Sequence, residues 1–71
     1  MRPHHAHHSL TTRERECLRM VSDGFTAKQI SEGLGISVRT VESHLANAMH
    51  KLDSATRAQA IATAIRAGWL D

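Results

Sequence analysis

The chain has 71 residues, a formal net charge of +2, one Phe, one Trp and no Tyr. This length allows one small domain with a modest core, and the near-absence of aromatic residues disfavours single-strand nucleic-acid binding by base stacking. The single cysteine, Cys17, excludes an internal disulfide and a multi-cysteine zinc site, and no apolar run approaches the ~20 residues that cross a membrane.

Residues 1–9 show no hydrophobic periodicity and contain His4, His5, His7 and His8. We interpret this segment as a flexible, His-rich lead or linker. Imidazoles bind transition metals, but neither a carboxylate nor a thiolate accompanies these four, and nothing in the sequence preorganises them. His-rich tracts of this kind are typical of adventitious metal binding, so we predict no metal site and no cofactor.

Three later segments begin with the pattern T-x-x-E/Q, at Thr11, Thr26 and Thr56. In this capping box, the hydroxyl and the side chain three positions later satisfy each other's backbone N–H groups at a helix start. Ser37 is a fourth good N-cap residue. Four helix starts and no alternating strand pattern predict an all-α fold. The helices should cover about 12–22, 27–34, 38–52 and 57–67.

A tight turn joins the second and third predicted helices. Gly35 ends the second helix, since glycine readily takes the left-handed conformation that follows a helix, and Ser37 begins the third. Two helices joined by a short turn with a glycine form the helix-turn-helix motif. The third helix has apolar residues at positions 38, 41, 45, 48, 49 and 52, the spacing of one buried face. Its opposite face is polar and could enter a groove.

The predicted core comes from the inner stripes of these helices. The first helix contributes Cys17, Leu18 and Val21, and the last helix contributes Ala58, Ile61 and Ile65. Cys17 is therefore expected to be a buried thiol rather than a nucleophile. Trp69 and Leu70, which follow the last helix, can fold back over the core as a lid.

Residues 10–16 read LTTRERE, which fits the pattern L-T-x-R-E-x-E. Further landmarks follow in order: Gly24, 28–30 (KQI), 34–37 (LGIS), 40–41 (TV), His44, 51–52 (KL) and Ala60. Together these residues resemble the LuxR/FixJ-type DNA-binding domains over residues 10–70. The run 47–52, NAMHKL, is similar to the N-A-M-x-K-L of the quorum-sensing LuxR branch. The resemblance implies a four-helix LuxR-type helix-turn-helix domain over residues 10–71, which in most relatives follows a separate regulatory domain.

In the half of the third helix that would enter a major groove, the exposed residues are Arg39, Glu42, Ser43 and Ala46. Arg39 could donate to guanine or hold a phosphate, Ser43 can donate or accept, and Ala46 offers a methyl contact to thymine. Glu42 departs from the resemblance, which implies that a lysine is common there. Its carboxylate can accept from cytosine N4. The alternatives are an ion pair with Arg39, or a repulsion that lowers the affinity for DNA.

Phosphate contacts are expected at the helix starts, where free N–H groups and the helix dipole favour anions. Lys28, in the first turn of the second helix, is the best candidate. The supporting candidates are Thr26, Thr40, Asn47 and Lys51. The arginines of the first helix are instead expected to pair with Glu14 and Glu16 on a solvated face.

The last helix has a second stripe of small side chains, at Ala60, Thr63, Ala64 and Ala67. We predict that this stripe faces outward and pairs two copies, because small side chains let two helices approach closely. The resemblance also implies that this helix pairs across a two-fold axis. A homodimer formed mainly on DNA would bind an inverted repeat. The alternative is that the alanines only serve helix propensity.

These features predict sequence-specific binding of double-stranded DNA for transcription regulation, by a cytoplasmic response-regulator or quorum-sensing effector domain. RNA polymerase is a further candidate partner. The alternative function is a LuxR-like protein-interaction module that pairs with a regulator and modulates it, which Glu42 and the low net charge favour. An enzyme is disfavoured because the sequence shows no nucleophile–base pair and no metal cluster.

Overall fold

The computed structural model describes residues 9–71, so the prediction for the His-rich lead lies, apart from Ser9, outside the described residues. The described part contains the helices α1 (Thr12–Ser22), α2 (Ala27–Leu34), α3 (Val38–Lys51) and α4 (Arg57–Arg66). No residue of this part is in a strand. The predicted all-α class and the four predicted helices are confirmed, and every predicted helix boundary is met to within one residue.

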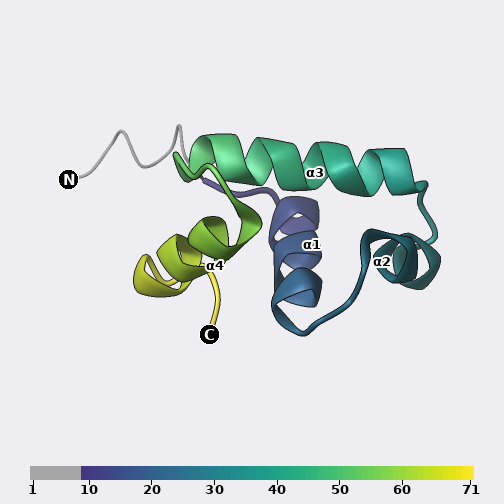
Figure 1. Cartoon of the computed structure of the whole chain (residues 1–71), viewed down its shortest axis with the longest axis horizontal. Helices are drawn as coiled ribbons and strands as arrows, with labels where there is room; N and C mark the ends of the chain where they lie inside the picture. The colour runs from purple at the N-terminus through teal and green to yellow at the C-terminus, as the bar shows by residue number, and fades with distance from the viewer. Residues whose placement is uncertain (1–8) are drawn as a thin grey trace.

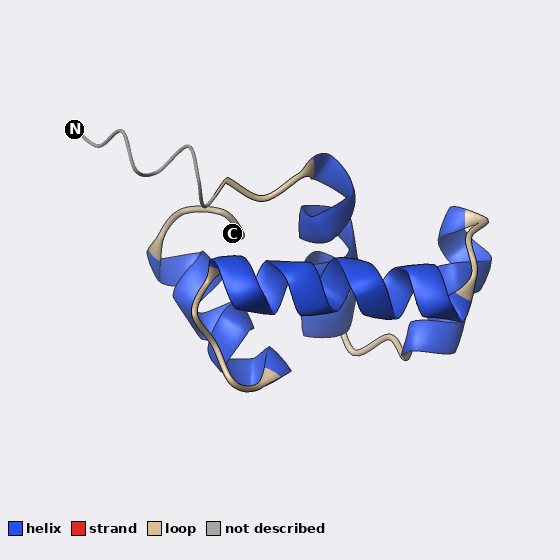
Figure 2. Ribbon diagram, turned by 90° about the horizontal axis from the view of Figure 1, so that it is seen from above, coloured by secondary structure: helices blue, strands red, loops and turns tan. Residues whose placement is uncertain are grey.

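α3 is the long helix against which the other three pack (Figure 1). α1 lies beneath its middle, α2 beneath its N-terminal end and α4 beneath its C-terminal end. Seen from above, α3 crosses in front of the other helices along its whole length (Figure 2). Because no described helix lies over this outer side, α3 buries one face and leaves the opposite face open.

Side-chain caps begin α1 and α2 as the sequence predicts. The Thr11 hydroxyl accepts from Glu14 N over 3.0 Å, and the Glu14 carboxylate accepts from Thr11 N over 2.9 Å. Thr26 and Gln29 exchange the same two bonds over 3.1 and 2.9 Å. Each bond satisfies a donor that has no partner inside the helix, so these two helix starts are determined locally.

α4 forms only half of its predicted capping box. Thr56 Oγ1 accepts from Gln59 N over 3.1 Å, but Gln59 Oε1 accepts from Ala55 N over 2.8 Å rather than from Thr56 N. Thr56 has a φ of −131°, whereas Thr11 and Thr26 have φ values of −69° and −78°. In α4 the glutamine side chain thus satisfies the N–H of the residue before the cap rather than the N–H of the cap itself.

Gly35 makes the turn between α2 and α3. Its φ of 70° lies in the left-handed region, where any side chain would be strained. Ile36 N donates to Ser31 O over 3.1 Å and closes the end of α2. Ser37 then caps α3, its Oγ accepting from Thr40 N over 3.0 Å. The predicted helix-turn-helix connection is confirmed.

The core draws buried side chains from all four helices. The largest fully buried side chains are Cys17, Leu18, Ile30, Val41 and Leu45. Burial raises the pKa of the Cys17 thiol, which confirms the predicted buried cysteine. Leu70 is 4% exposed and Trp69 packs half-buried against the core, so the predicted lid is also confirmed.

The orientation predicted for α4 is wrong. Ala60 and Ala64 are fully buried, whereas Ala58 is exposed and Ile65 is 47% exposed. Both stripes of this helix are apolar, so periodicity could not decide which one faces inward. α4 packs on α1 and α3, and the distance between two packed helices depends on the side chains at their contact. The small alanines occupy that contact, and the larger Ile65 remains near the surface.

Candidate nucleic-acid interface

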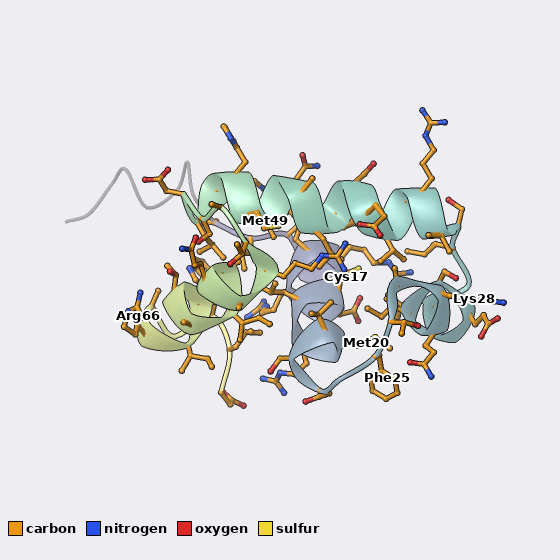
Figure 3. All side chains as sticks on the ribbon, viewed as in Figure 1. Cys17, Met20, Phe25, Lys28, Met49 and Arg66 are labelled. Atoms are coloured by element: carbon orange, nitrogen blue, oxygen red, sulfur yellow. The ribbon has the colours of Figure 1, made fainter. Side chains whose placement is uncertain are left out.

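The outer face of α3 consists of the residues predicted to read bases. Arg39, Glu42, Ser43 and Ala46 are all exposed, and side chains project from this side of α3 away from the other helices (Figure 3). The inner face of the same helix is buried through Val41, Leu45 and Ala48. Since the major groove of DNA is about 12 Å wide and admits an α-helix, this outer face has the shape and polarity to enter it.

Lys28 is exposed in the first turn of α2 and points away from the body of the molecule (Figure 3). It lies at the same end of the molecule as the start of α3. The N-terminus of a helix attracts anions through its free N–H groups and its dipole. Thr26, the cap of α2, is also exposed, and its hydroxyl accepts from Gln29 N while keeping its own hydrogen to donate.

Thr40 and Asn47, two further phosphate candidates, are exposed on α3. Thr40 Oγ1 accepts from Ser37 Oγ over 2.9 Å, which leaves the hydrogen of the Thr40 hydroxyl available to an outside acceptor. His44, in contrast, is half-buried. The helix-turn-helix side of the molecule therefore presents hydroxyl and amide donors together with the Lys28 ammonium.

Most cationic side chains of the described residues already have a partner. Ion pairs join Arg13 to Glu16, Arg19 to Asp71, Lys51 to Glu14 and Arg57 to Glu42, and Arg66 donates to the Thr63 hydroxyl. Within residues 9–71, the side chains of Arg15, Lys28 and Arg39 form neither an ion pair nor a hydrogen bond. Two of these three unpaired cations, Lys28 and Arg39, belong to the helix-turn-helix.

Lys51, one of the predicted phosphate ligands, is already engaged within the fold. Its Nζ donates to Glu14 Oε1 over 2.8 Å and to Ser9 O over 3.2 Å. Glu14 was predicted on a solvated face of the first helix, but it is only 4% exposed. Burial raises the pKa of this carboxyl, but the hydrogen bonds from Lys51 and Thr11 and the charge of Lys51 outweigh burial, so its pKa lies below the usual 4.5. The pair joins the start of α1 to the end of α3 and belongs to the fold.

Glu42 pairs with a residue that its position in the sequence does not suggest. Arg57 Nη2 donates to Glu42 Oε1, so the predicted alternative of an ion pair with Arg39 is wrong. Arg57 is the first residue of α4 and lies 15 positions further along the chain. No helical periodicity connects two such residues, because their contact depends on how α4 packs against α3. As far as residues 9–71 show, the outer face of α3 thus carries one unpaired cation, Arg39, and one neutralised carboxylate, Glu42.

The exposed apolar surface of α4 lies on the side that was predicted to be buried. This surface, which we call the α4 stripe, consists of Ala58, Ile61, Ala62 and Ile65, of which Ile61 is half-buried. Of the predicted dimer residues, Ala67 is exposed and Thr63 half-buried, whereas Ala60 and Ala64 are in the core and cannot contact a second copy. The three core residues predicted for this helix, Ala58, Ile61 and Ile65, all belong to the stripe, and of these Ile61 packs partly against the core.

Within residues 9–71, no three His, Cys, Asp or Glu side chains are placed to hold a metal ion. The four histidines of the lead lie outside this part of the chain, so the absence of a metal site stays a prediction. No helix among the described residues is both long enough and apolar enough to cross a membrane.

A buried inner face, an open polar outer face and a preceding short helix define α2 and α3 as the helix-turn-helix unit of a four-helix domain. The family model for bacterial regulatory proteins of the luxR family matches residues 8–64. The chain belongs to this family, which confirms the resemblance seen in the sequence.

Two relatives and one solved structure show how far the similarity extends. The chain is 44% identical over 66 residues to the transcriptional activator protein LuxR of Aliivibrio fischeri, which covers 93% of the chain and 26% of that protein. It is 40% identical over 63 residues to the transcriptional regulatory protein DegU of Brevibacillus brevis, covering 89% and 27%. The solved structure of the transcription factor GerE matches with a TM-score of 0.84 and 40% identity, covering 87% of this chain and 92% of that one.

The chain therefore spans about a quarter of the length of the LuxR and DegU proteins. It corresponds to one domain shared by regulators that are otherwise much longer. The narrower resemblance to the quorum-sensing branch, carried by residues 47–52, stays a prediction.

Proposed function

We propose that this chain is the DNA-binding domain of a transcription regulator, and that it binds double-stranded DNA sequence-specifically through α3. The observation that carries the proposal is the outer face of α3, which is exposed and polar and is accompanied by Lys28 and Arg39, two cations without a partner among the described residues. The relatives support it, because a transcriptional activator and a transcriptional regulatory protein share this domain over most of its length. Contact with a bacterial chromosome requires the cytoplasm, so the proposal includes that compartment.

In the proposed complex, the N-terminal half of α3 enters the major groove. Arg39 donates to guanine O6 and N7, Ser43 hydrogen-bonds a base edge, and the Ala46 methyl group contacts a thymine methyl. Lys28 holds a phosphate beside the start of α2. The remaining phosphate ligands are Thr26, Thr40 and Asn47. Phosphate contacts fix the register of the helix on the duplex, whereas base contacts supply the sequence preference.

A mobility shift with random-sequence duplex at low salt tests this function. Lys28→Ala should weaken binding to all duplexes alike and reduce the salt slope by about one unit, because one phosphate contact is lost. Arg39→Ala should instead cost ~1–3 kcal/mol at one base pair. Arg15→Ala is the matched control, since Arg15 is also an exposed, unpaired arginine but lies on α1.

Each outcome of this assay distinguishes between functions. If the unsubstituted chain does not shift random duplex at low salt, the proposal fails and the alternative applies, a module that pairs with another regulator. If Arg15→Ala weakens binding as much as Lys28→Ala and Arg39→Ala, the domain binds DNA but not through the outer face of α3.

We further propose that two copies pair through the α4 stripe when they are bound to DNA. The stripe is exposed and apolar, and a two-fold axis brings the same patch of both copies together. The operator would then be an inverted repeat with its half-sites about one helical turn apart. α4 has only 10 residues, so the free chain should be a monomer or a weak dimer. RNA polymerase is a second candidate partner of the DNA-bound form.

Two neighbouring substitutions in α4 test this pairing. Ile65→Arg should abolish cooperative occupancy of two half-sites and spare the affinity for a single half-site, because residue 65 is at the surface. Ala64→Arg should unfold the domain instead, because it forces a charge into the core. Circular dichroism reports folding, and mobility shifts with one and two half-sites report pairing. Cooperative binding by the folded Ile65→Arg variant would show that the copies pair elsewhere.

A further inference from the structure

We propose that Arg57 is a positioning residue for base recognition, and that by holding Glu42 it determines which base pair α3 selects. This role rests on the proposed function, in which α3 enters the major groove. The two residues come from different helices: Glu42 lies in the first half of α3, and Arg57 is the first residue of α4. Their side chains are 49% and 40% exposed, so the ion pair lies at the surface beside the outer face of α3.

The charge of the ion pair is the first reason. Double-stranded DNA carries one negative charge per about 1.7 Å of its axis, so a lone carboxylate on α3 would be repelled by the phosphates that border the groove. The guanidinium of Arg57 cancels this charge, because its Nη2 donates directly to Glu42 Oε1. The Glu42 carboxylate remains a hydrogen-bond acceptor, while the pair as a whole is neutral.

The geometry of the ion pair is the second reason. Arg57 contacts one carboxylate oxygen, Oε1, and no described residue donates to the other oxygen, Oε2. Oε2 is therefore the atom that can accept from cytosine N4 in the major groove. A guanidinium has five N–H donors in a fixed plane. Arg57 can thus hold Glu42 in one orientation and still contact a phosphate.

Arg39 does not share this task. It lies three positions before Glu42 on the same helix, where an ion pair is sterically possible. Within residues 9–71, however, the Arg39 side chain has no partner. Arg39 and Glu42 are consequently free to contact different base pairs. The contact between α3 and α4 orients only the Glu42 side chain.

Selection from random duplexes with four proteins tests the proposal: the unsubstituted chain, Glu42→Gln, Arg57→Gln and the double variant. Glu42→Gln should lower the preference for cytosine at one position by about five- to tenfold. Arg57→Gln should lower the preference at the same position by a similar factor, and the double variant should lower it no further. Arg57→Lys keeps the charge but loses the planar fork, so it should retain part of the preference.

The matched control is Arg13→Gln, which breaks the exposed ion pair with Glu16 on α1 and should leave the selected sequence unchanged. Circular dichroism checks that each variant folds. If Arg57→Gln weakens binding to all sequences equally and preserves the base preference, Arg57 is only a phosphate ligand and the proposal is overturned. An unchanged preference in Glu42→Gln overturns it as well. Failure of the proposed function is distinct, since the unsubstituted chain would then recover no preferred sequence at all.

Discussion

Two ion pairs join different helices of the described residues, and they differ in burial. Glu14 and Lys51 connect α1 to the end of α3, with side chains 5% and 26% exposed. Glu42 and Arg57 connect α3 to α4, with side chains 49% and 40% exposed. Both are ion pairs between a glutamate and a basic side chain, but one lies in a buried environment and the other at the surface. The buried pair is committed to the fold, whereas the exposed pair can interact with water, ions or DNA, so burial rather than residue type separates the two roles.

The largest effect should come from Lys51→Met. This substitution replaces the lysine by an apolar side chain of similar length. It leaves the Glu14 carboxylate buried without its cationic partner. We expect the free energy of unfolding to fall by ~2–4 kcal/mol, since a buried charge that loses its partner is costly. Urea unfolding followed by circular dichroism measures this loss.

The double variant Glu14→Gln, Lys51→Met is the control for that experiment. It should recover part of the stability, because a neutral amide replaces the stranded carboxylate. A loss below ~1 kcal/mol in Lys51→Met would place the buried pair in the same range as exposed ion pairs, and the contrast between the two pairs would disappear.

A smaller effect should appear in the pH dependence of stability. The pKa of Glu14 in the folded chain lies below its ordinary value of 4.5, so the unfolded chain binds this proton more readily. The stabilisation is fully present above that ordinary value and is lost as the pH falls through the lower folded-state pKa. Urea unfolding of the unsubstituted chain and of Glu14→Gln at decreasing pH should give free energies that converge in acid. Parallel curves would assign the acid loss to another carboxylate.

The smallest effect on stability should come from Arg57→Gln. Exposed ion pairs contribute less than about 1 kcal/mol, and added salt should remove most of the difference. Urea unfolding at low and high salt measures it. If this variant loses as much stability as Lys51→Met, the exposed pair also holds the fold together, and its effect on base preference could not be separated from unfolding.

The helix starts show how much of the fold could be predicted from the sequence. Thr11, Thr26 and Ser37 cap their helices through hydrogen bonds to residues three positions away. A pattern of such short spacing can be recognised directly in the sequence. Gly35 at a φ of 70° makes the turn for an equally local reason. The outer face of α3 was predictable as well, because only one side of that helix is apolar.

The candidate site was less completely predictable, and Arg57 shows why. Arg57 is the first residue of α4, and nothing in the sequence predicts that it contacts the polar face of α3. The partner of Lys51 was not predictable for the same reason, since that carboxylate lies 37 positions away in α1. How a charged residue can contribute to DNA binding depends on which distant side chain it meets, and that partner is set by packing.

By itself, the sequence determined the helices, their caps, the turn and the polar side of α3, since each follows from residues within about one helical turn of one another. Only the tertiary structure decided which side of α4 faces inward and which carboxylate each cation meets. Both stripes of α4 are apolar, so hydrophobicity alone does not select the buried one. α4 packs closely on α1 and α3, and this close packing favours the small Ala60 and Ala64 over Ile65 at the contact. The pairing of Glu42 with Arg57 followed from that packing, because the orientation of α4 places its first residue against α3.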